Sequence, residues 1–323
     1  MLLLASFLTA HFGQWRQSWH DTNPVRAGQP LLGAEERYEG ALALLDWDRR
    51  SICWSRSFDT PSGICFADEN LYLASMLGNR LYVLGSRLQV ESTLSVPQFN
   101  DVHTVVMSSR GLLITSSGID GIIEVSLDGR LLWHWLATEH GYDRTPAGYL
   151  RRVSLREDGR RRDHRTPEQT THCNSAVFTG PDEGAVLATL FHQGQLIRIE
   201  RRTGRHEVLV SGMTRAHAVR PAPWGGWTCC DSQNGSVVVL TPDFRIQNVI
   251  EGGFDWTQDA LPTPARTLLV ADANHHRVVE VDLEGAVVAD LVVPEEWKFF
   301  QIESVPAAWE ARLLAVGARR EAS

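Results

Sequence analysis

Residues 268–281 read LLVADANHHRVVEV, which is an apolar strand, a short polar loop and a second, alternating strand. The same phrase occurs four times earlier, as LYLASMLGNRLYVL (71–84), LLITSSGIDGIIEV (112–125), VLATLFHQGQLIRI (186–199) and WTCCDSQNGSVVVL (227–240). The second strand of each phrase starts at Arg80, Ile122, Gln195, Ser236 and Arg277, at separations of 42, 73, 41 and 41 residues. A repeat of about 41 residues, with one long interval, is typical of β-propeller blades.

Each phrase is preceded by a shorter strand and followed by a turn and a fourth strand. Five such four-stranded units begin at residues 59, 101, 170, 214 and 255 of the 323-residue chain. Six units of about 42 residues and two insertions of about 30 account for about 312 residues, whereas seven units need about 354. The spacing therefore predicts an all-β fold, a six-bladed β-propeller that forms a single domain over residues 1–323.

The sixth blade has to be shared between the two ends of the chain, which would close the ring and remove two exposed sheet edges. We expect residues 40–58 to supply its outer strands and residues 300–316 its inner strands. Residues 2–7, LLLASF, resemble LYLASM and are favoured as the second strand, in competition with residues 312–316. An amphipathic helix over residues 2–19 is the alternative.

Composition excludes several classes of protein. With 31 basic and 39 acidic residues the net charge is -8, so nucleic acid is not an expected partner. The five cysteines have no CxxC spacing, and no apolar run is long enough to span a bilayer. The start, MLLLASFL, lacks the positive region of a secretory signal, so we expect a cytoplasmic protein. Lys298 is the only lysine, a bias that a GC-rich genome would produce.

Polar and titratable residues occur where the inner strand of each predicted blade starts. Strand propensity alone would place valine or isoleucine there. Inner-strand starts surround the axis of a propeller, so we expect these side chains to meet at one end of the central channel. The candidates are His103, His172, His217, Gln258, Asp259 and Glu303.

The loops between second and third strands open on the same face, and they add His192 and His275 as candidate substrate-binding residues. We expect two insertions, residues 8–39 and 138–170, to cover this face as lids. The second insertion carries an arginine run that includes Arg160, Arg161 and Arg162. Arginine binds carboxylate, sulfate and phosphate groups through its forked donors, so this run predicts an anionic substrate.

The phrase VADANHHRVVEVDLEG resembles the repeats of six-bladed NHL-type propellers. HCNSAVF, from His172, and GIIEVSLDGRLLWHW are similar to strands of arylsulfotransferase-like propellers. That resemblance implies an axial histidine that transfers sulfate, and it adds Asn174 to the substrate-binding candidates. The peptide-amidating lyase propeller is similar in having three inner-strand histidines, which implies a metal on His103, His172 and His217.

The leading hypothesis is a lyase or transferase that acts on a small molecule with an anionic leaving group. Elimination, intramolecular displacement and group transfer all fit acid/base chemistry by His103, His172, His217 and Glu303, because imidazole titrates near neutral pH. In the alternative, a metal-dependent lyase or hydrolase, the three histidines hold a divalent ion. A noncatalytic propeller that binds a protein partner is the third hypothesis, and a homodimer stays open. Without a Gly-rich phosphate loop, no nucleotide cofactor is expected.

Overall fold

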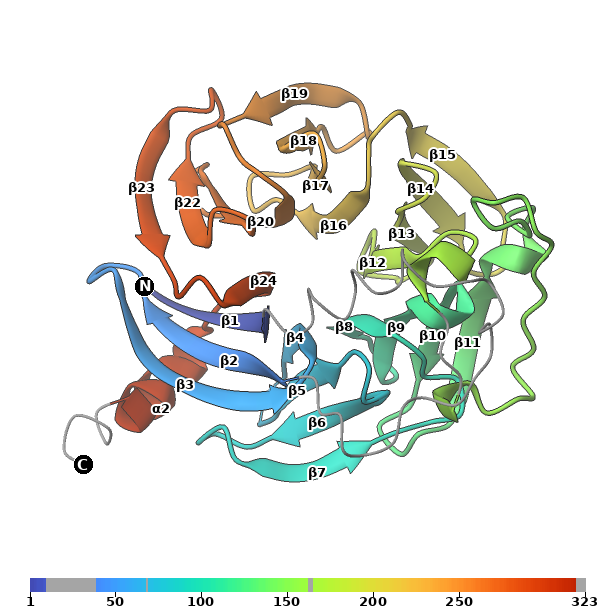
Figure 1. Ribbon diagram of the computed structural model, residues 1–323, viewed down its shortest axis with the longest axis horizontal. Coiled ribbons are helices and arrows are strands. Elements are labelled where there is room, and N and C mark those ends of the chain that lie inside the picture. The colour runs from blue at the N-terminus through green and yellow to red at the C-terminus, as the bar shows by residue number, and fades with distance from the viewer. Residues whose placement is uncertain (10–38, 68, 162–164, 318–323) are drawn as a thin grey trace.

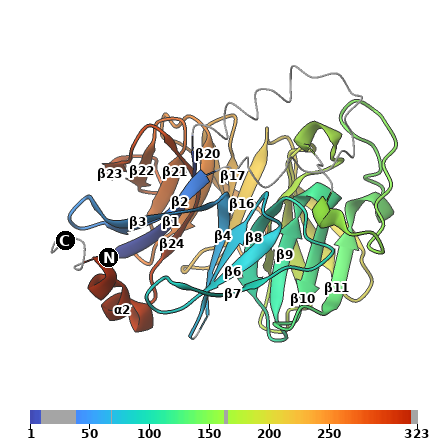
Figure 2. The same ribbon diagram turned by 60° about the horizontal axis from the view of Figure 1, so that its bottom comes forward.

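The computed structural model describes residues 1–9, 39–67, 69–161 and 165–317. Its strands form six antiparallel sheets of four strands each, arranged as blades around a central axis (Figure 1). A tilted view shows the blades standing side by side around that axis (Figure 2). The prediction of an all-β, six-bladed propeller is confirmed. In the part of the chain that the structure describes, no helix is long and apolar enough to cross a membrane.

Five blades consist of four consecutive strands each, with the first strand innermost. Their second strands are buried along their whole length, because neighbouring blades cover both faces, and this explains their continuous apolar sequences. The bounds are β4 (Pro61–Phe66), β5 (Leu71–Ser75), β6 (Arg80–Leu84), β7 (Val90–Leu94); β8 (Val102–Met107), β9 (Leu112–Ser116), β10 (Gly121–Val125), β11 (Leu131–Leu136); β12 (Cys173–Phe178), β13 (Ala185–Leu190), β14 (Gln195–Glu200), β15 (His206–Val210); β16 (Ala216–Pro221), β17 (Trp227–Asp231), β18 (Ser236–Leu240), β19 (Ile246–Glu251); β20 (Thr257–Pro262), β21 (Leu268–Asp272), β22 (Arg277–Val281) and β23 (Val287–Val292).

The closing blade joins both ends of the chain in the order β24-β1-β2-β3. Its innermost strand is β24 (Trp297–Ser304), followed outward by β1 (Leu2–Thr9), β2 (Glu39–Asp46) and β3 (Ser51–Asp59). The prediction that residues 2–7 form the second strand is confirmed. Every residue from Leu2 to Leu8 is buried, so this apolar strand fits a central place in the sheet and not the surface helix of the alternative interpretation.

One part of the predicted closure is wrong. Residues 40–58 supply the outer strands and residues 300–304 belong to the innermost strand, as expected, but the two segments share the blade without pairing directly because β1 lies between them. Residues 307–316 do not form a strand. Beyond β24 the chain forms α2 (Ala307–Gly317), whose alanine, glutamate, arginine and leucine residues favour a helix. Trp309 and Leu313, four residues apart, share one face of α2 and are buried against the closing blade and its neighbour.

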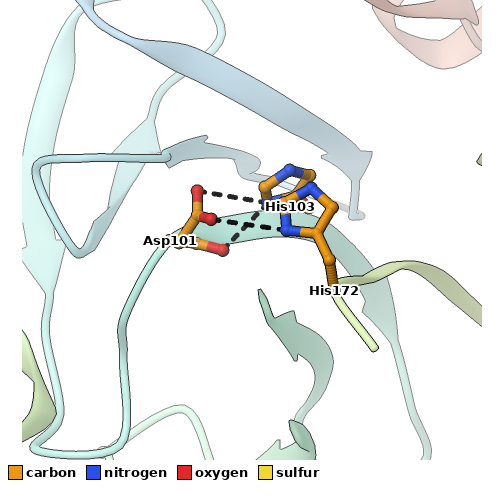
Figure 3. A group of neighbouring side chains, drawn as sticks. All are labelled: Asp101, His103 and His172. Carbon is orange, nitrogen blue, oxygen red and sulfur yellow. Dashed lines mark hydrogen bonds and ion pairs between the residues drawn. The ribbon is translucent and has the colours of Figure 1, made fainter. Parts of the chain in front are cut away.

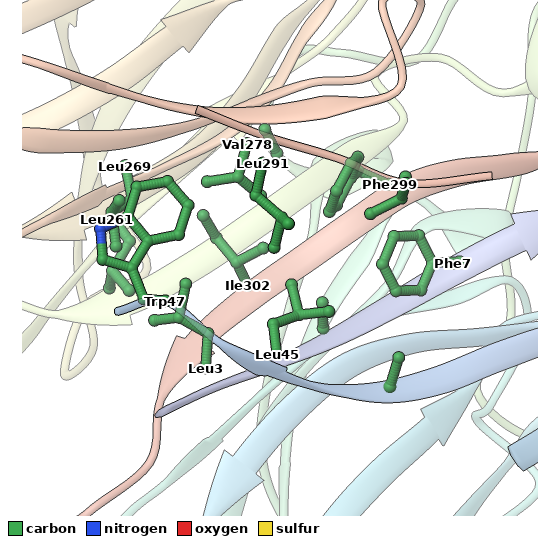
Figure 4. Close-up of a cluster of buried hydrophobic side chains, with 14 of the residues drawn as sticks. Leu3, Phe7, Leu45, Trp47, Leu261, Leu269, Val278, Leu291, Phe299 and Ile302 are labelled. Carbon is green, nitrogen blue, oxygen red and sulfur yellow. The ribbon is translucent and has the colours of Figure 1, made fainter. Parts of the chain in front are cut away.

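The core is divided among the interfaces between adjacent blades. Between the closing blade and the β20–β23 blade, inward-facing residues of both sheets interdigitate around Leu3, Phe7, Trp47 and Ile302 (Figure 4). Phe7 lies 4.5 Å from the ring centre of Phe299 on the neighbouring strand. The ring of blades is therefore held shut by apolar packing as well as by strand pairing.

The second predicted insertion, residues 138–170, follows β11 and contains short 3-10 turns at Gly159–Arg161 and Thr166–Glu168, after turns at Ser117–Ile119 and Ala137–Glu139. A buried ion pair between Arg151 and Asp120 links the insertion to the blade formed by β8–β11. Asp120 also accepts hydrogen bonds from the backbone amides of Thr170 and Thr171, at 2.9 and 2.7 Å. Most of the first predicted insertion, residues 8–39, lies outside the described residues.

Candidate functional site

A cavity of about 650 Å³ lies on the axis, at the end of the ring where the inner strands begin. This volume suits a molecule of metabolite size. The cavity is lined by the starts of inner strands, by loops between second and third strands, and by three residues of the 138–170 insertion. The lining consists of Leu8, Met76, Asp101, His103, Pro146, Thr166, Pro167, His172, Phe191, His192, Arg215, His217, Gln233, Trp256, Gln258, Ala273, Asn274, Lys298, Phe299 and Phe300.

All three histidines singled out from the repeat border this cavity. The ring centres of His103 and His172 are 4.7 Å apart and meet edge to face. Phe191 lies between His172 and His217, at 5.0 and 5.3 Å from their ring centres. The structure therefore brings two of the histidines into contact and separates the third from them by an aromatic ring.

The expectation that the three histidines occupy equivalent positions is wrong. In five blades the residue immediately before the inner strand has a positive φ. The residue after it is the first of the inner strand to pair with the second strand. These residues are Thr60, Asp101, His172, Arg215 and Trp256, with φ of 37, 53, 49, 66 and 65°, respectively.

His172 thus corresponds to Asp101 and Arg215, whereas the residue that corresponds to His103 and His217 is Asn174. His172 therefore lies two residues earlier in its blade than His103 and His217 do in theirs. The long insertion before this blade makes the repeat spacing irregular, so this difference could not be recognised from the sequence. His172 consequently enters the cavity from the bend before its strand and meets the side chain of Asp101, its equivalent in the preceding blade.

Asp101 joins His103 and His172 in a buried cluster (Figure 3). One carboxylate oxygen lies 3.5 Å from Nδ1 of His103 and the other lies 3.7 Å from Nδ1 of His172. Gln169 donates to the same carboxylate from Nε2 at 3.0 Å, and its Oε1 contacts Nδ1 of His172. Asp101 was missed in the sequence, although its place two residues before His103 in the segment NDVH could have indicated it.

Hydrogen bonds define which nitrogen of each ring carries the proton in the neutral form. Nδ1 of His103 lies 2.9 Å from the backbone carbonyl of Asp101, which can only accept. Nδ1 of His172 faces the amide oxygen of Gln169, because the amide nitrogen is used by Asp101. Both neutral rings therefore carry hydrogen on Nδ1 and a lone pair on Nε2.

His217 has different partners. Its Nδ1 is 2.8 Å from the backbone carbonyl of Arg215 and 2.8 Å from the hydroxyl of Ser232. It lines the axial cavity and also a narrower channel of about 70 Å³ that continues the axis between the inner strands. It stands apart from the Asp101 cluster and belongs to the wall between the two spaces.

The placement of Glu303 does not support its predicted role beside the histidines. It lines the narrow channel but not the axial cavity, and its carboxylate binds the guanidinium of Arg220. Burial raises the pKa of Glu303, although Arg220 opposes this shift. Asp259, also predicted to bind substrate, holds the same guanidinium with both carboxylate oxygens. These residues form a buried ionic cluster in the channel.

The other predicted substrate-binding residues are divided between the two spaces. Gln258 lines both, and its Oε1 accepts a hydrogen bond from Trp256 at 2.8 Å. Asn174 lines the narrow channel. His192 lines the cavity with Nε2 2.8 Å from the carbonyl of Thr166, and burial lowers its pKa. His275 lines neither space, and its Nδ1 pairs with Asp272 at 2.8 Å.

Of Arg160, Arg161 and Arg162 in the predicted arginine run, the structure describes the side chain of Arg160 alone, and this side chain does not line the cavity. Arg160 forks onto Asp158 at 2.7 and 2.8 Å and is absent from the lining, whereas the side chain of Arg161 and all of Arg162 lie outside the described residues. The cationic side chains in the lining are Arg215 and Lys298, and neither has a carboxylate within ion-pair distance in the described part of the chain. Sequence reasoning missed both.

Comparisons with known proteins agree on the fold. A protein in a nidogen/laminin complex superposes with a TM-score of 0.60 at 12% identity, over 94% of this chain and 97% of that one. The periplasmic gluconolactonase of Pseudomonas aeruginosa gives 0.54 at 13%, over 94% and 100%. A streptogramin B lyase gives 0.50 at 13%, over 73% and 69%. No protein-family description and no curated protein matches the sequence.

The chain is a six-bladed β-propeller, and the resemblance to NHL-type propellers holds at the level of the fold. Its distinguishing feature is an axial cavity that contains two touching imidazoles, one shared carboxylate and two cationic side chains.

Proposed function

We propose that this protein is an enzyme of lyase type that eliminates an anionic leaving group from a small molecule bound in the axial cavity. The contact of His103 and His172 across the Asp101 carboxylate carries this proposal. An elimination needs a base for one proton and an acid for another, and two imidazoles meet both needs near neutral pH. A gluconolactonase and a lyase are built on the same fold, so the fold accommodates such an enzyme.

In this mechanism His172 takes a proton from the carbon adjacent to the one that bears the leaving group. The electrons of the broken C–H bond form a double bond as the bond to the leaving group breaks. His103 gives its proton to the departing group. Because Asp101 lies within 3.7 Å of Nδ1 on both rings, its charge balances one imidazolium while the other ring stays neutral.

Elimination is the best fit among the three reaction types considered. The described lining of the cavity contains no serine or cysteine that could form a covalent intermediate. Cys173, next to His172, is fully buried and burial raises the pKa of its thiol to about 12. Group transfer would therefore have to use a histidine or Lys298 as the nucleophile, whereas elimination uses the touching pair His103 and His172 as acid and base.

Replacing Arg215 with asparagine is expected to weaken binding of an anionic ligand about 10- to 100-fold, because a charge-assisted hydrogen bond contributes roughly 1.5–3 kcal/mol. Asparagine is chosen because Arg215 has a φ of 66°. The screen uses sulfate, phosphate and small carboxylates in thermal-shift and calorimetric titrations. Arg160→Ala is the control, since Asp158 already holds that guanidinium. Equal loss in both variants would argue against Arg215 as the anion-binding residue.

A metal-dependent lyase is the second candidate, favoured by one observation. Asp101, His103 and His172 each offer a ligand atom within 4.8 Å of the others, so this donor set fits a divalent ion better than the predicted set with His217. A bound ion would polarise the substrate or activate water. The Nδ1 atoms that face Asp101 hydrogen-bond to carbonyl oxygens, and coordination needs an unprotonated nitrogen, so the histidines would have to hold the ion at Nε2.

Metal analysis of protein purified without an affinity tag separates the two candidates. Acid/base elimination predicts less than one equivalent of any transition metal, and activity that survives chelation. About one equivalent per chain, lost in Asp101→Asn, would establish the metal site instead.

The protein-binding hypothesis predicts a channel filled by packed apolar side chains. The cavity lined by His103, His172 and Arg215 favours a small molecule over that alternative. A cytoplasmic location, a homodimer and the absence of nucleic-acid binding remain predictions.

A further inference from the structure

The single lysine of the chain lies in the axial cavity. Lys298 is the second residue of β24, pairs with Leu8 of β1, and lines the same space as His103 and His172. Its side chain is half-buried. A chain with 30 arginines could place an arginine here if only positive charge were needed, so the chemistry of a primary amine is the distinguishing property of this position.

The neighbours of the Lys298 amine are hydrogen-bond acceptors without charge. Nζ lies 3.4 Å from Oδ1 of Asn274 and 3.4 Å from Nε2 of His276. Nδ1 of His276 is 3.1 Å from the backbone carbonyl of Trp297. That carbonyl can only accept, so Nδ1 carries the hydrogen and Nε2 presents its lone pair to the lysine.

Burial, and not the charge of a neighbour, favours loss of the lysine proton. Burial lowers the pKa of Lys298, and Asp255 opposes this shift. Asp255 does not reach Nζ directly, because its carboxylate accepts a hydrogen bond from Asn274 at 2.9 Å. The ammonium thus has a neutral imidazole at hand as proton acceptor and no carboxylate within ion-pair distance among the described residues.

We propose that Lys298 is a covalent carbonyl-binding residue, which forms an imine with a small aldehyde or ketone that carries an anionic group, such as a 2-oxo acid. His276 accepts the ammonium proton at Nε2. The amine then attacks the carbonyl carbon, and a C–N bond forms as the C=O π electrons move to oxygen. The oxygen takes one proton from the attacking nitrogen and one back from Nε2 of His276, and the C–O bond breaks as water leaves the iminium. The inference rests on the proposed function, because the iminium would acidify the adjacent C–H bond that His172 is proposed to break.

Reductive trapping tests this role directly. The protein is incubated with glyoxylate or pyruvate and cyanoborohydride at pH 7, and the adducts are located by peptide mass mapping. Only two aliphatic amines are available, Lys298 and the N-terminus, so the assignment is unambiguous. We expect Lys298 to react about tenfold or more faster than Nα-acetyllysine, because its lowered pKa leaves more free amine and the cavity holds the carbonyl compound beside it.

Variants of the two adjacent histidines supply the matched comparison. His276→Asn is expected to slow trapping because the proton acceptor beside Nζ is lost, and asparagine tolerates the φ of 53° at this position. His275→Asn should leave trapping unchanged, since His275 pairs with Asp272 and not with Lys298. Lys298→Arg should abolish the adduct outside the N-terminus while the thermal midpoint stays near that of the parent protein.

A rate equal to that of Nα-acetyllysine, or of the urea-unfolded chain, would overturn the proposal, as would equal slowing by His275→Asn. The trapping experiment can fail independently of the proposed elimination. In His172→Asn, Lys298 should be trapped at the parental rate while turnover is lost, and this result would support both the imine role of Lys298 and the base role of His172. Normal turnover in Lys298→Arg would reject the lysine and leave the histidines in place.

Discussion

Replacing Arg220 with methionine is expected to lower the free energy of unfolding by about 3–5 kcal/mol, the usual cost of removing one partner from a buried ionic group. Arg220 binds both Asp259 and Glu303 and donates to the carbonyl of Ile302 at 2.8 Å. Asp259 is only 1% exposed. Methionine retains most of the length of arginine without its charge, so two carboxylates would face each other in the channel. Urea unfolding at pH 7 measures the loss.

The same variant should show a characteristic pH dependence. Without Arg220 nothing opposes the effect of burial on Glu303, so the pKa of this carboxyl in the folded state rises further above its unfolded value. The folded variant then takes up protons more readily than the unfolded chain, so its deficit shrinks as the pH falls from 7 to 5 and grows as the pH rises. Burial already raises the pKa of Glu303 in the parent protein, in the same direction.

Two controls make the Arg220 result specific. Adding Asp259→Asn and Glu303→Gln to Arg220→Met should restore part of the lost stability, because no charge is left in the channel. Arg245→Met removes an exposed ion pair with Asp243 and should leave the free energy of unfolding nearly unchanged. A loss of similar size in Arg220→Met and Arg245→Met would contradict the buried-cluster interpretation.

Replacing His172 with asparagine is expected to lower kcat by about 10²- to 10⁴-fold with a small change in KM, as for a group that transfers a proton in the transition state. Asparagine suits the φ of 49° at this residue, whereas most other side chains would strain it. Steady-state kinetics with a substrate found by the anion screen provides the measurement. Circular dichroism and the thermal midpoint report whether the fold is intact.

His217→Asn gives the comparison within the same cavity. His217 lies outside the Asp101 cluster and binds Ser232, so we expect a loss below tenfold. Full activity of the His172 variant would show that this ring serves structure alone. A greater loss at His217 than at His172 would transfer the chemistry to the other side of Phe191.

The fold could be predicted in most of its parts because a propeller repeats. The spacing of the five phrases determined the number of blades, and strand alternation placed apolar residues between them. The closing blade was the weak point. Residues 312–316 resemble a strand when taken alone. In a helix, however, Trp309 and Leu313 share one face and pack against the closing blade and its neighbour.

For the site, the sequence determined that polar residues start the inner strands and surround one axis. Only the tertiary structure decided which of them meet. A residue of positive φ before five of the six inner strands shifts side chains between the cavity and the channel, and spacing across a long insertion cannot reveal that shift. This is why His172 meets Asp101. Glu303 comes from β24 and pairs with Arg220 of another blade in the narrow channel, a contact that local sequence does not contain. Lys298 enters the cavity because β24 closes the ring against β1, a contact between the two ends of the chain that local sequence does not contain.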